Sequence, residues 1–222
     1  MMGAMELHTI YAVVVGSRAY GLAGPDSDTD RRGVFLAPTP AYWGLDQPPS
    51  HVEGPGEDFA WEVERFCRLA LQANPTVLEC LWSPLVEQVD DTGAELVRLR
   101  GAFLSRRVAQ TYGGYARDQM TRVASARART GTIRWKQAMH MLRLLIAGEH
   151  TLRTGEVMVD VGADRDALLA VRRGEVPFSE VEAWAERLTT AMGSAEAASE
   201  LPDEPDRSAV SAFLVATRRA HL

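Results

Sequence analysis

The residues of this sequence best suited to chemistry lie in residues 16–30, where Gly16 and Ser17 follow an apolar run and Asp28 and Asp30 come further along. A strand that ends in Gly-Ser offers backbone N–H groups and a hydroxyl that an anion can approach closely, because glycine has no side chain. Asp28 and Asp30 are separated by one residue, so an extended backbone points both carboxylates to one face. Two such carboxylates repel each other unless a divalent cation lies between them, and oxygen ligands suit Mg²⁺. The pattern therefore indicates a phosphate site beside a magnesium site, as nucleotidyl transfer requires.

Each part of this stretch also has a purely structural explanation. A Gly-Ser after a strand is common, and an Asp-x-Asp pair is often a polar loop, here with Asp26 and Ser27 in a turn. The spacing fits neither a calcium-binding loop nor a Walker loop, since the required glutamate and the Gly-Lys-Ser/Thr are missing. The combination of Gly-Ser, a short insert and Asp-x-Asp is more specific than any of its parts.

The elements that must position these residues fall into two groups. Apolar β-branched runs predict strands over residues 10–15 and 33–36, with a third strand near residue 58 and an exposed loop over residues 43–56. From residue 61 the apolar spacing becomes helical, and Asn74 followed by Pro75 is typical of a helix start.

Further helices are predicted over residues 76–82, 94–99, 103–125, 133–147, 165–172, 179–192 and 208–219, the helix over residues 133–147 being capped by Gly148. The layout predicts an α+β protein, with a nucleotide-binding α/β core over residues 1–95. A mostly helical part, residues 96–222, would complete the nucleotide cleft.

Charge and composition narrow the class of protein. A net charge of −6 argues against non-specific coating of nucleic acid, yet residues 98–153 hold 12 Lys and Arg against 2 acids. This basic segment is either a local anion site or a solvated arginine-rich helical face. The apolar runs are too short for a membrane span, no secretory signal is evident, and the two cysteines lack zinc-like spacing, so we expect a cytoplasmic protein.

A second set of cations lies in the predicted helix over residues 133–147. Lys136 is the only lysine of the chain, and with His140 and Arg143 it falls on one helical face. These three side chains would contact a bound triphosphate from the helical side of the cleft. The alternative is a half-exposed face on which His140 packs against Leu144.

These motifs resemble the signature of the DNA polymerase beta-type nucleotidyltransferases, and most closely the RNA repair pathway DNA polymerase beta family of predicted nucleotidyltransferases. The resemblance rests on residues 16–21, 26–34, 62–66 and 74–79 and on Lys136-x-x-x-His140-x-x-Arg143-Leu144-Leu145. It extends over most of residues 10–175 and implies a mixed β-sheet flanked by helices.

The resemblance also implies the roles of the site residues. Asp28 and Asp30 would hold Mg²⁺, with a third carboxylate as metal ligand and general base, for which Asp58 and Glu62 are the two candidates. Gly16 and Ser17 would hold the triphosphate. The further residues expected at the nucleotide are Arg18, Lys136, His140 and Arg143, with a salt bridge to Asp28 or Asp30 as the alternative for Arg18.

The activity that follows is transfer of a nucleoside monophosphate from an NTP to an acceptor hydroxyl, with release of pyrophosphate. Mg²⁺, or Mn²⁺ in its place, would be the metal and ATP the expected NTP. The acceptor would be an RNA end, a small molecule or a protein, and no membrane partner is expected. The alternative is a catalytically silent nucleotide-binding sensor or partner subunit.

Overall fold

The computed structural model describes residues 7–56 and 58–222 and is built around a five-stranded β-sheet. The strands are β1 (His8–Val15), β2 (Asp30–Leu36), β3 (His51–Glu53), β4 (Phe59–Glu62) and β5 (Val86–Val89). Their order across the sheet is β3-β4-β2-β1-β5. The β2 and β4 strands are parallel, and the other neighbouring pairs are antiparallel. The mixed sheet of the predicted α+β fold is confirmed.

The register between β1 and β2 positions the start of the signature stretch. Ile10, Val13 and Val15 of β1 are buried, as expected for β-branched residues in a central strand. Val15 lies opposite Asp30, the first residue of β2. The next residue, Gly16, begins the short helix α1 (Gly16–Ala19), so the chain leaves β1 beside the point where it later enters β2.

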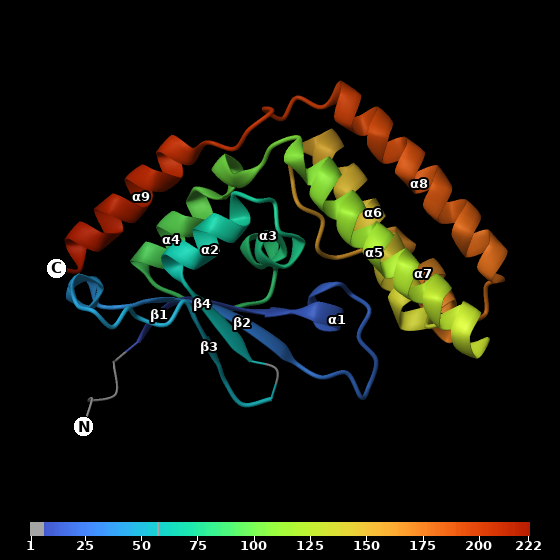
Figure 1. The fold of residues 1–222 in the computed structure, drawn as a ribbon, viewed down its shortest axis with the longest axis horizontal. Helices are drawn as coiled ribbons and strands as arrows, with labels where there is room; N and C mark the ends of the chain where they lie inside the picture. Colours follow the sequence, from blue (N-terminus) through green and yellow to red (C-terminus); the bar gives the residue numbers. More distant parts are fainter. Residues whose placement is uncertain (1–6, 57) are drawn as a thin grey trace.

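Helices lie above the sheet in the view of Figure 1 and form a second mass of structure beside it. Near the sheet lie α2 (Val63–Ala70), α3 (Pro75–Trp82) and α4 (Asp91–Arg98). The Asn74 side chain caps α3 by accepting from the Val77 N–H, as predicted. The later helices are α5 (Arg107–Thr130), α6 (Trp135–Thr154), α7 (Arg165–Arg173), α8 (Phe178–Ala198) and α9 (Arg207–Ala220), and short 3₁₀ turns are η1 (Thr39–Trp43), η2 (Arg100–Phe103) and η3 (Gly162–Asp164).

The prediction that Gly148 ends its helix is wrong. The α6 helix continues to Thr154 and is capped by Gly155 in the left-handed conformation. A Cβ on Gly148 would lie 3.0 Å from Met192 Sδ and 3.0 Å from Tyr112 Cβ. This glycine therefore permits close packing of α6 against α5 and α8 rather than a change of chain direction.

The α9 helix returns to the sheet, far from α8 in space (Figure 1). Arg218 of α9 donates to Glu62 Oε1 at 2.8 Å and to the Tyr42 hydroxyl at 2.9 Å, and its carbonyl accepts from the Thr39 hydroxyl at 3.0 Å. The division of the chain into two parts at residue 95 stays a prediction. In the structure, residues 207–220 pack with the sheet half of the chain.

Among the described residues, no helix has the length and apolar character needed to cross a membrane. Cys67 and Cys80 are free, buried thiols. Burial raises the pKa of both thiols, so neither is a thiolate nucleophile at neutral pH.

Candidate active site

A cleft of about 900 Å³ opens at the end of the sheet where β1 ends and β2 begins. One wall consists of the signature stretch, including Gly16, Ser17 and the loop that leads into β2. The opposite wall comes from α6 and α7. The two predicted parts of the chain thus meet around one cavity, large enough for a ligand of nucleotide size.

The sheet wall of the cleft carries three carboxylates and one guanidinium, that of Arg32. Asp26, Asp28 and Asp30 all line it, and within the described part of the chain none of the three forms an ion pair. Asp28 is exposed and Asp30 is half-buried. The Ser17 hydroxyl lines the same cavity, and it too is free of hydrogen bonds to the residues described. Polar groups that have no partner among the described residues are suited to binding a ligand rather than to stabilising the fold.

Gly16 and Asp30 are in direct contact. Gly16 has a φ of +69°, a conformation that favours glycine, and a Cβ at this position would overlap Asp30 Oδ2. The glycine of the signature thus gives the Asp30 carboxylate its place at the turn after β1.

We expect Gly16→Ala to displace the Asp30 carboxylate and to weaken the binding of Mg²⁺ at this end of the cleft. The positive φ alone costs about 1–3 kcal/mol of folding free energy. Gly131→Ala is the matched control, because Gly131 also has a φ of +69° but no atom of the described residues lies within 4 Å of its added Cβ.

Urea unfolding and calorimetric titration with Mg²⁺ measure the two effects separately. Gly131→Ala should lower stability and leave the metal affinity unchanged. Equal metal affinities in the two variants would contradict the role given to the Gly16 contact.

The opposite wall is basic. Lys136 and His140 of α6 line the cleft, as predicted, and α7 adds Arg165, Arg172 and Arg173. The sequence interpretation predicted the α7 helix but missed its arginines. The spacing of these arginines could have identified them, because residues seven and eight positions apart fall on one face of a helix.

The imidazole of His140 is neutral at pH 7. Burial, followed by the positive charges of Arg143, Lys136 and Arg172, lowers the pKa of His140 to about 4. A neutral imidazole has one N–H donor and one acceptor nitrogen, so His140 can donate to a ligand oxygen without adding charge.

Arg18 has a different role from either of those predicted for it. Its guanidinium donates to the backbone carbonyls of Ser27 at 2.7 Å and Asp28 at 3.2 Å, and it is not among the residues that line the cleft. The contact fixes the loop that carries Asp28. Arg18 therefore positions a site residue instead of forming a salt bridge to it.

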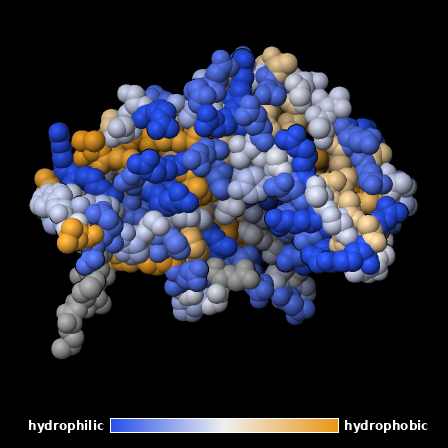
Figure 2. All heavy atoms as spheres, in the orientation of Figure 1, coloured by the Kyte–Doolittle hydropathy of each residue, from blue (hydrophilic) through white to orange (hydrophobic). Residues whose placement is uncertain are grey.

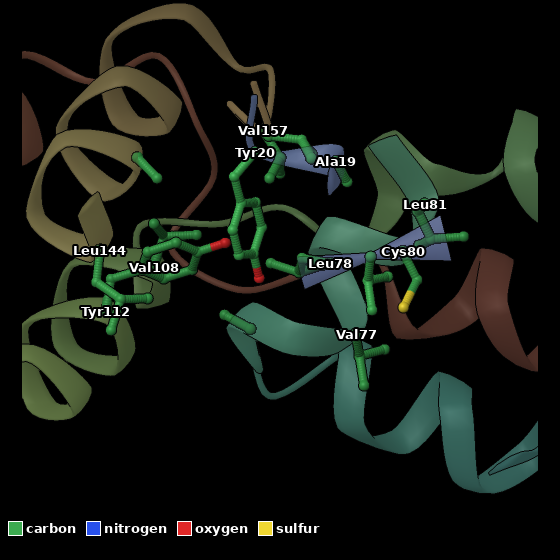
Figure 3. Close-up of a cluster of buried hydrophobic side chains, with 14 of the residues drawn as sticks. Ala19, Tyr20, Val77, Leu78, Cys80, Leu81, Val108, Tyr112, Leu144 and Val157 are labelled. Carbon is green, nitrogen blue, oxygen red and sulfur yellow. The ribbon is translucent and has the colours of Figure 1, made fainter. Parts of the chain in front are cut away.

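Arg143 is buried away from the cleft, in contact with the sheet half of the chain. Its Nη1 donates to Glu79 Oε1 at 2.6 Å, and the Tyr20 hydroxyl donates to Glu79 Oε2 at 2.6 Å. The guanidinium also lies over the Tyr20 ring, 3.8 Å from the centroid. Tyr20 sits in the apolar cluster of Figure 3 together with Leu144 of α6 and Val77 of α3. We call Tyr20, Glu79 and Arg143 the buried triad; it joins the residue that follows α1 to α3 and α6.

The structure does not bring Asp58 into the cleft. Asp58 lies in the turn before β4, where its carbonyl accepts from the Gly54 N–H at 2.8 Å. Phe59 pairs with Arg32, so Asp58 lies beside Arg31. The pKa of Arg31 is raised mainly by the hydrogen bond and the charge of Glu87, and to a smaller extent by the charge of Asp58. Successive strand residues point to opposite faces, which places this neighbourhood on the face opposite Asp30.

Glu62 lies at the far end of β4 from the cleft. It is buried, pairs with Arg218, and caps α2 by accepting from the Glu64 N–H at 2.7 Å. In the parallel register it neighbours Phe35, five residues beyond Asp30 along β2, or about 16 Å. These contacts assign it to the anchoring of α9 and α2.

Over the described residues, no group of three or more Asp, Glu, His or Cys side chains is arranged to hold a metal ion. Two unpaired carboxylates in an open cleft still fit Mg²⁺, because this ion commonly binds one or two carboxylates and completes its shell with water and substrate phosphates. The donor set of Asp28 and Asp30 is of that kind.

The mixed sheet, the Gly-Ser turn and the aspartate-lined cleft are those of a nucleotidyltransferase-like protein. The model of the RNA repair pathway DNA polymerase beta family (RlaP) matches residues 3–216. The chain belongs to this family.

Two further comparisons give one protein that is similar over part of its length and one solved structure of low similarity. The uncharacterized protein YcgL of Bacillus subtilis (strain 168) is 36% identical over 93 residues, which are 40% of this chain and 36% of that protein. The chain thus matches little more than a third of that relative's length. The crystal structure of a nucleotidyltransferase-like protein from Exiguobacterium sibiricum 255-15 aligns over 97% of this chain and 74% of its own, at a TM-score of 0.34 and 12% identity.

Proposed function

We propose that the protein transfers a nucleoside monophosphate from a magnesium-bound NTP to an acceptor hydroxyl. The observation that supports this is the division of charge across the cleft. Three aspartates that pair with no described cation line one wall together with Arg32, and the other wall carries Lys136, Arg172 and a neutral His140. A metal–triphosphate complex matches this arrangement, because its cation suits the acidic wall and its phosphate oxygens suit the basic wall.

In this proposal the chain's own groups divide the work. Asp28 and Asp30 hold Mg²⁺, which when bound neutralises charge on the phosphate oxygens. Ser17, Lys136 and His140 donate to the triphosphate, and Gly16, without a side chain, leaves room for the Asp30 carboxylate and offers its backbone N–H to the phosphates. ATP is the expected nucleotide, and Mn²⁺ is the expected substitute for Mg²⁺.

The reaction balances without a further cofactor. The acceptor oxygen forms a bond to the α-phosphorus, the bond from that phosphorus to the bridging oxygen breaks, and pyrophosphate leaves. The hydroxyl proton is released, and the acceptor gains a phosphodiester-linked nucleotide. The acceptor is an RNA end, a small-molecule hydroxyl or a protein hydroxyl.

The test uses two labels on the same nucleotide. The protein is incubated with Mg²⁺ and either α-³²P-ATP or γ-³²P-ATP, in the presence of total RNA, a small-molecule pool or the protein alone. We expect the α-label on one acceptor and the γ-label in pyrophosphate, with neither product formed in EDTA. The γ-label on the acceptor would mean phosphoryl transfer and would overturn the proposal.

A second candidate function is a nucleotide-binding sensor or partner subunit that does not turn over. It is favoured by one observation: no third carboxylate of the described chain joins Asp28 and Asp30. The same experiment separates the two functions. Magnesium-dependent ATP binding with no label on any acceptor would support the sensor.

A further inference from the structure

Exposed cations without an ion-pair partner among the described residues are concentrated around the turn between α5 and α6. In residues 7–56 and 58–222, eleven arginines form ion pairs with carboxylates. Exposed arginines without such a pair also occur in other segments, at positions 65, 117, 187, 207 and 219, but only around this turn do five unpaired cations fall within fifteen residues of the described chain. These five, which we call the cationic surface, are Arg122, Arg127, Arg129, Arg134 and Lys136.

The cationic surface is continuous with the cleft. Gly131 reverses the chain after α5, so the end of α5 and the start of α6 lie together. Lys136 belongs to both the surface and the basic wall of the cleft. Figure 2 shows strongly hydrophilic side chains gathered over the part of the molecule where Figure 1 places the end of α5. The surface therefore leads outward from the cleft.

A solvated helix end explains only part of this surface. Cations in the last turn of a helix are favoured by its dipole, which accounts for Arg127 and Arg129. It does not account for Arg122, Arg134 or Lys136, nor for the lack of any Asp or Glu in residues 119–148. Uncompensated like charges repel one another, so their concentration beside a cleft favours a polyanionic ligand.

We infer that the cationic surface binds the phosphodiester backbone of a single-stranded nucleic acid and presents its terminal hydroxyl to the cleft. This inference rests on the proposed nucleotidyl transfer, for which it names the acceptor. The net charge of −6 repels a polyanion from the rest of the molecule, so binding is confined to this surface. Guanidinium groups are suited to the task, since they donate two hydrogen bonds to one phosphate.

The inference is tested by strand binding without nucleotide. Fluorescein-labelled RNA and DNA oligonucleotides of about 15 residues and the same sequence are titrated with protein over a series of salt concentrations. Five backbone contacts predict that log K falls with log salt at a slope of about −3.5. Arg122, Arg129 and Arg134, each replaced by Gln in one triple variant, should reduce the slope to about −1.4 and weaken binding about 100-fold near 0.1 M salt.

A matched control carries the same change of net charge elsewhere. Arg68, Arg98 and Arg153 are exposed and each pairs with a nearby glutamate, so their triple Gln variant should bind the strand within about twofold of wild type. Lys136 is kept in both variants because it lines the cleft. Equal binding by the two triple variants, or wild-type binding that does not vary with salt, would overturn the inference.

Calorimetric titration with Mg·ATP distinguishes a failure of the strand-binding inference from a failure of the proposed function. Both triple variants should bind Mg·ATP like wild type, because none of the six arginines lines the cleft. Loss of strand binding with normal Mg·ATP binding supports the inference, and binding of RNA, of DNA or of both identifies the strand. No Mg·ATP binding by wild type would instead contradict the proposed function.

Discussion

Asp30→Asn is expected to lower nucleotidyl transfer by about 10³-fold while leaving the protein folded. The carboxylate would hold a metal ion whose stabilisation of the transition state amounts to several kcal/mol, and each 1.4 kcal/mol is a factor of ten in rate. Asp30 is half-buried and forms no ion pair with any residue that the structure describes, so its neutral isostere should change the free energy of unfolding by less than about 1 kcal/mol. Asp28→Asn should behave in the same way. Transfer rates, Mg²⁺ affinity and urea unfolding are the measurements.

Asp26→Asn is the matched control for both variants. Asp26 lies at the tip of the same loop and also lines the cleft, but it stands outside the Asp-x-Asp pair. We expect its transfer rate to stay within about threefold of wild type, because screened charge alone has a small effect at an exposed site. An equal loss in all three variants would mean that the charge of the loop matters and the carboxylate pair does not.

Arg143→Met and Glu79→Met are each expected to lower the free energy of unfolding by about 3–5 kcal/mol. Either change leaves one buried charge without its partner, and an uncompensated charge in the interior is costly. The double variant removes both charges, so it should lose less than the sum of the two single losses, by at least about 1.5 kcal/mol. Urea unfolding of the four proteins gives this coupling energy directly.

Arg68→Met is the comparison for this pair. Arg68 and Glu64 form an exposed pair one helical turn apart, with a separation of 2.7 Å. Its loss should cost no more than about 0.5 kcal/mol, since solvent screens the charges. Additive losses in the Glu79 and Arg143 variants would show that the buried triad contributes no more than an ordinary pair of core residues.

The sequence predicted the strands with continuous apolar character and missed two strands without it. β1 and β2 were found because most of their residues are buried. All four residues of β5 are exposed, and the three residues of β3 lie in a segment rich in Pro and Gly. Both are edge strands whose position depends on pairing with a neighbour, a tertiary effect that local pattern does not contain.

The candidate site was predicted best where the residues are close in sequence. Gly16, Ser17, Asp28 and Asp30 meet because one hairpin of strands joins them. Arg143 has the helical phase of Lys136, but it lies seven residues further along α6, about 10 Å, where the helix is buried in the core. The spacing of residues along a helix predicts which face a side chain lies on. How far along the helix the cleft extends depends on the packing of the helix against the rest of the protein.

The third carboxylate required knowledge of strand order. Asp58 and Glu62 differ by four residues, and each could meet Asp30 only for a particular direction and face of β4. The parallel pairing with β2 places Glu62 beside Phe35 and leaves Asp58 beside Arg31. Neither relation follows from local spacing, because parallel pairing is set by the crossover between the strands.

The buried triad has a mechanical consequence for the way in which a ligand enters and leaves. Its members come from both sides of the cleft, so swinging the helical half away as a rigid lid would pull Arg143 from Glu79 in a water-free interior. The cost of that separation opposes a hinge motion. Under the proposed function, nucleotide would then exchange through rotamer changes of Lys136 and the arginines and through the loop before β2, and we expect the cleft to keep nearly the same width when a ligand binds. A receptor of fixed width loses little conformational entropy when its ligand arrives.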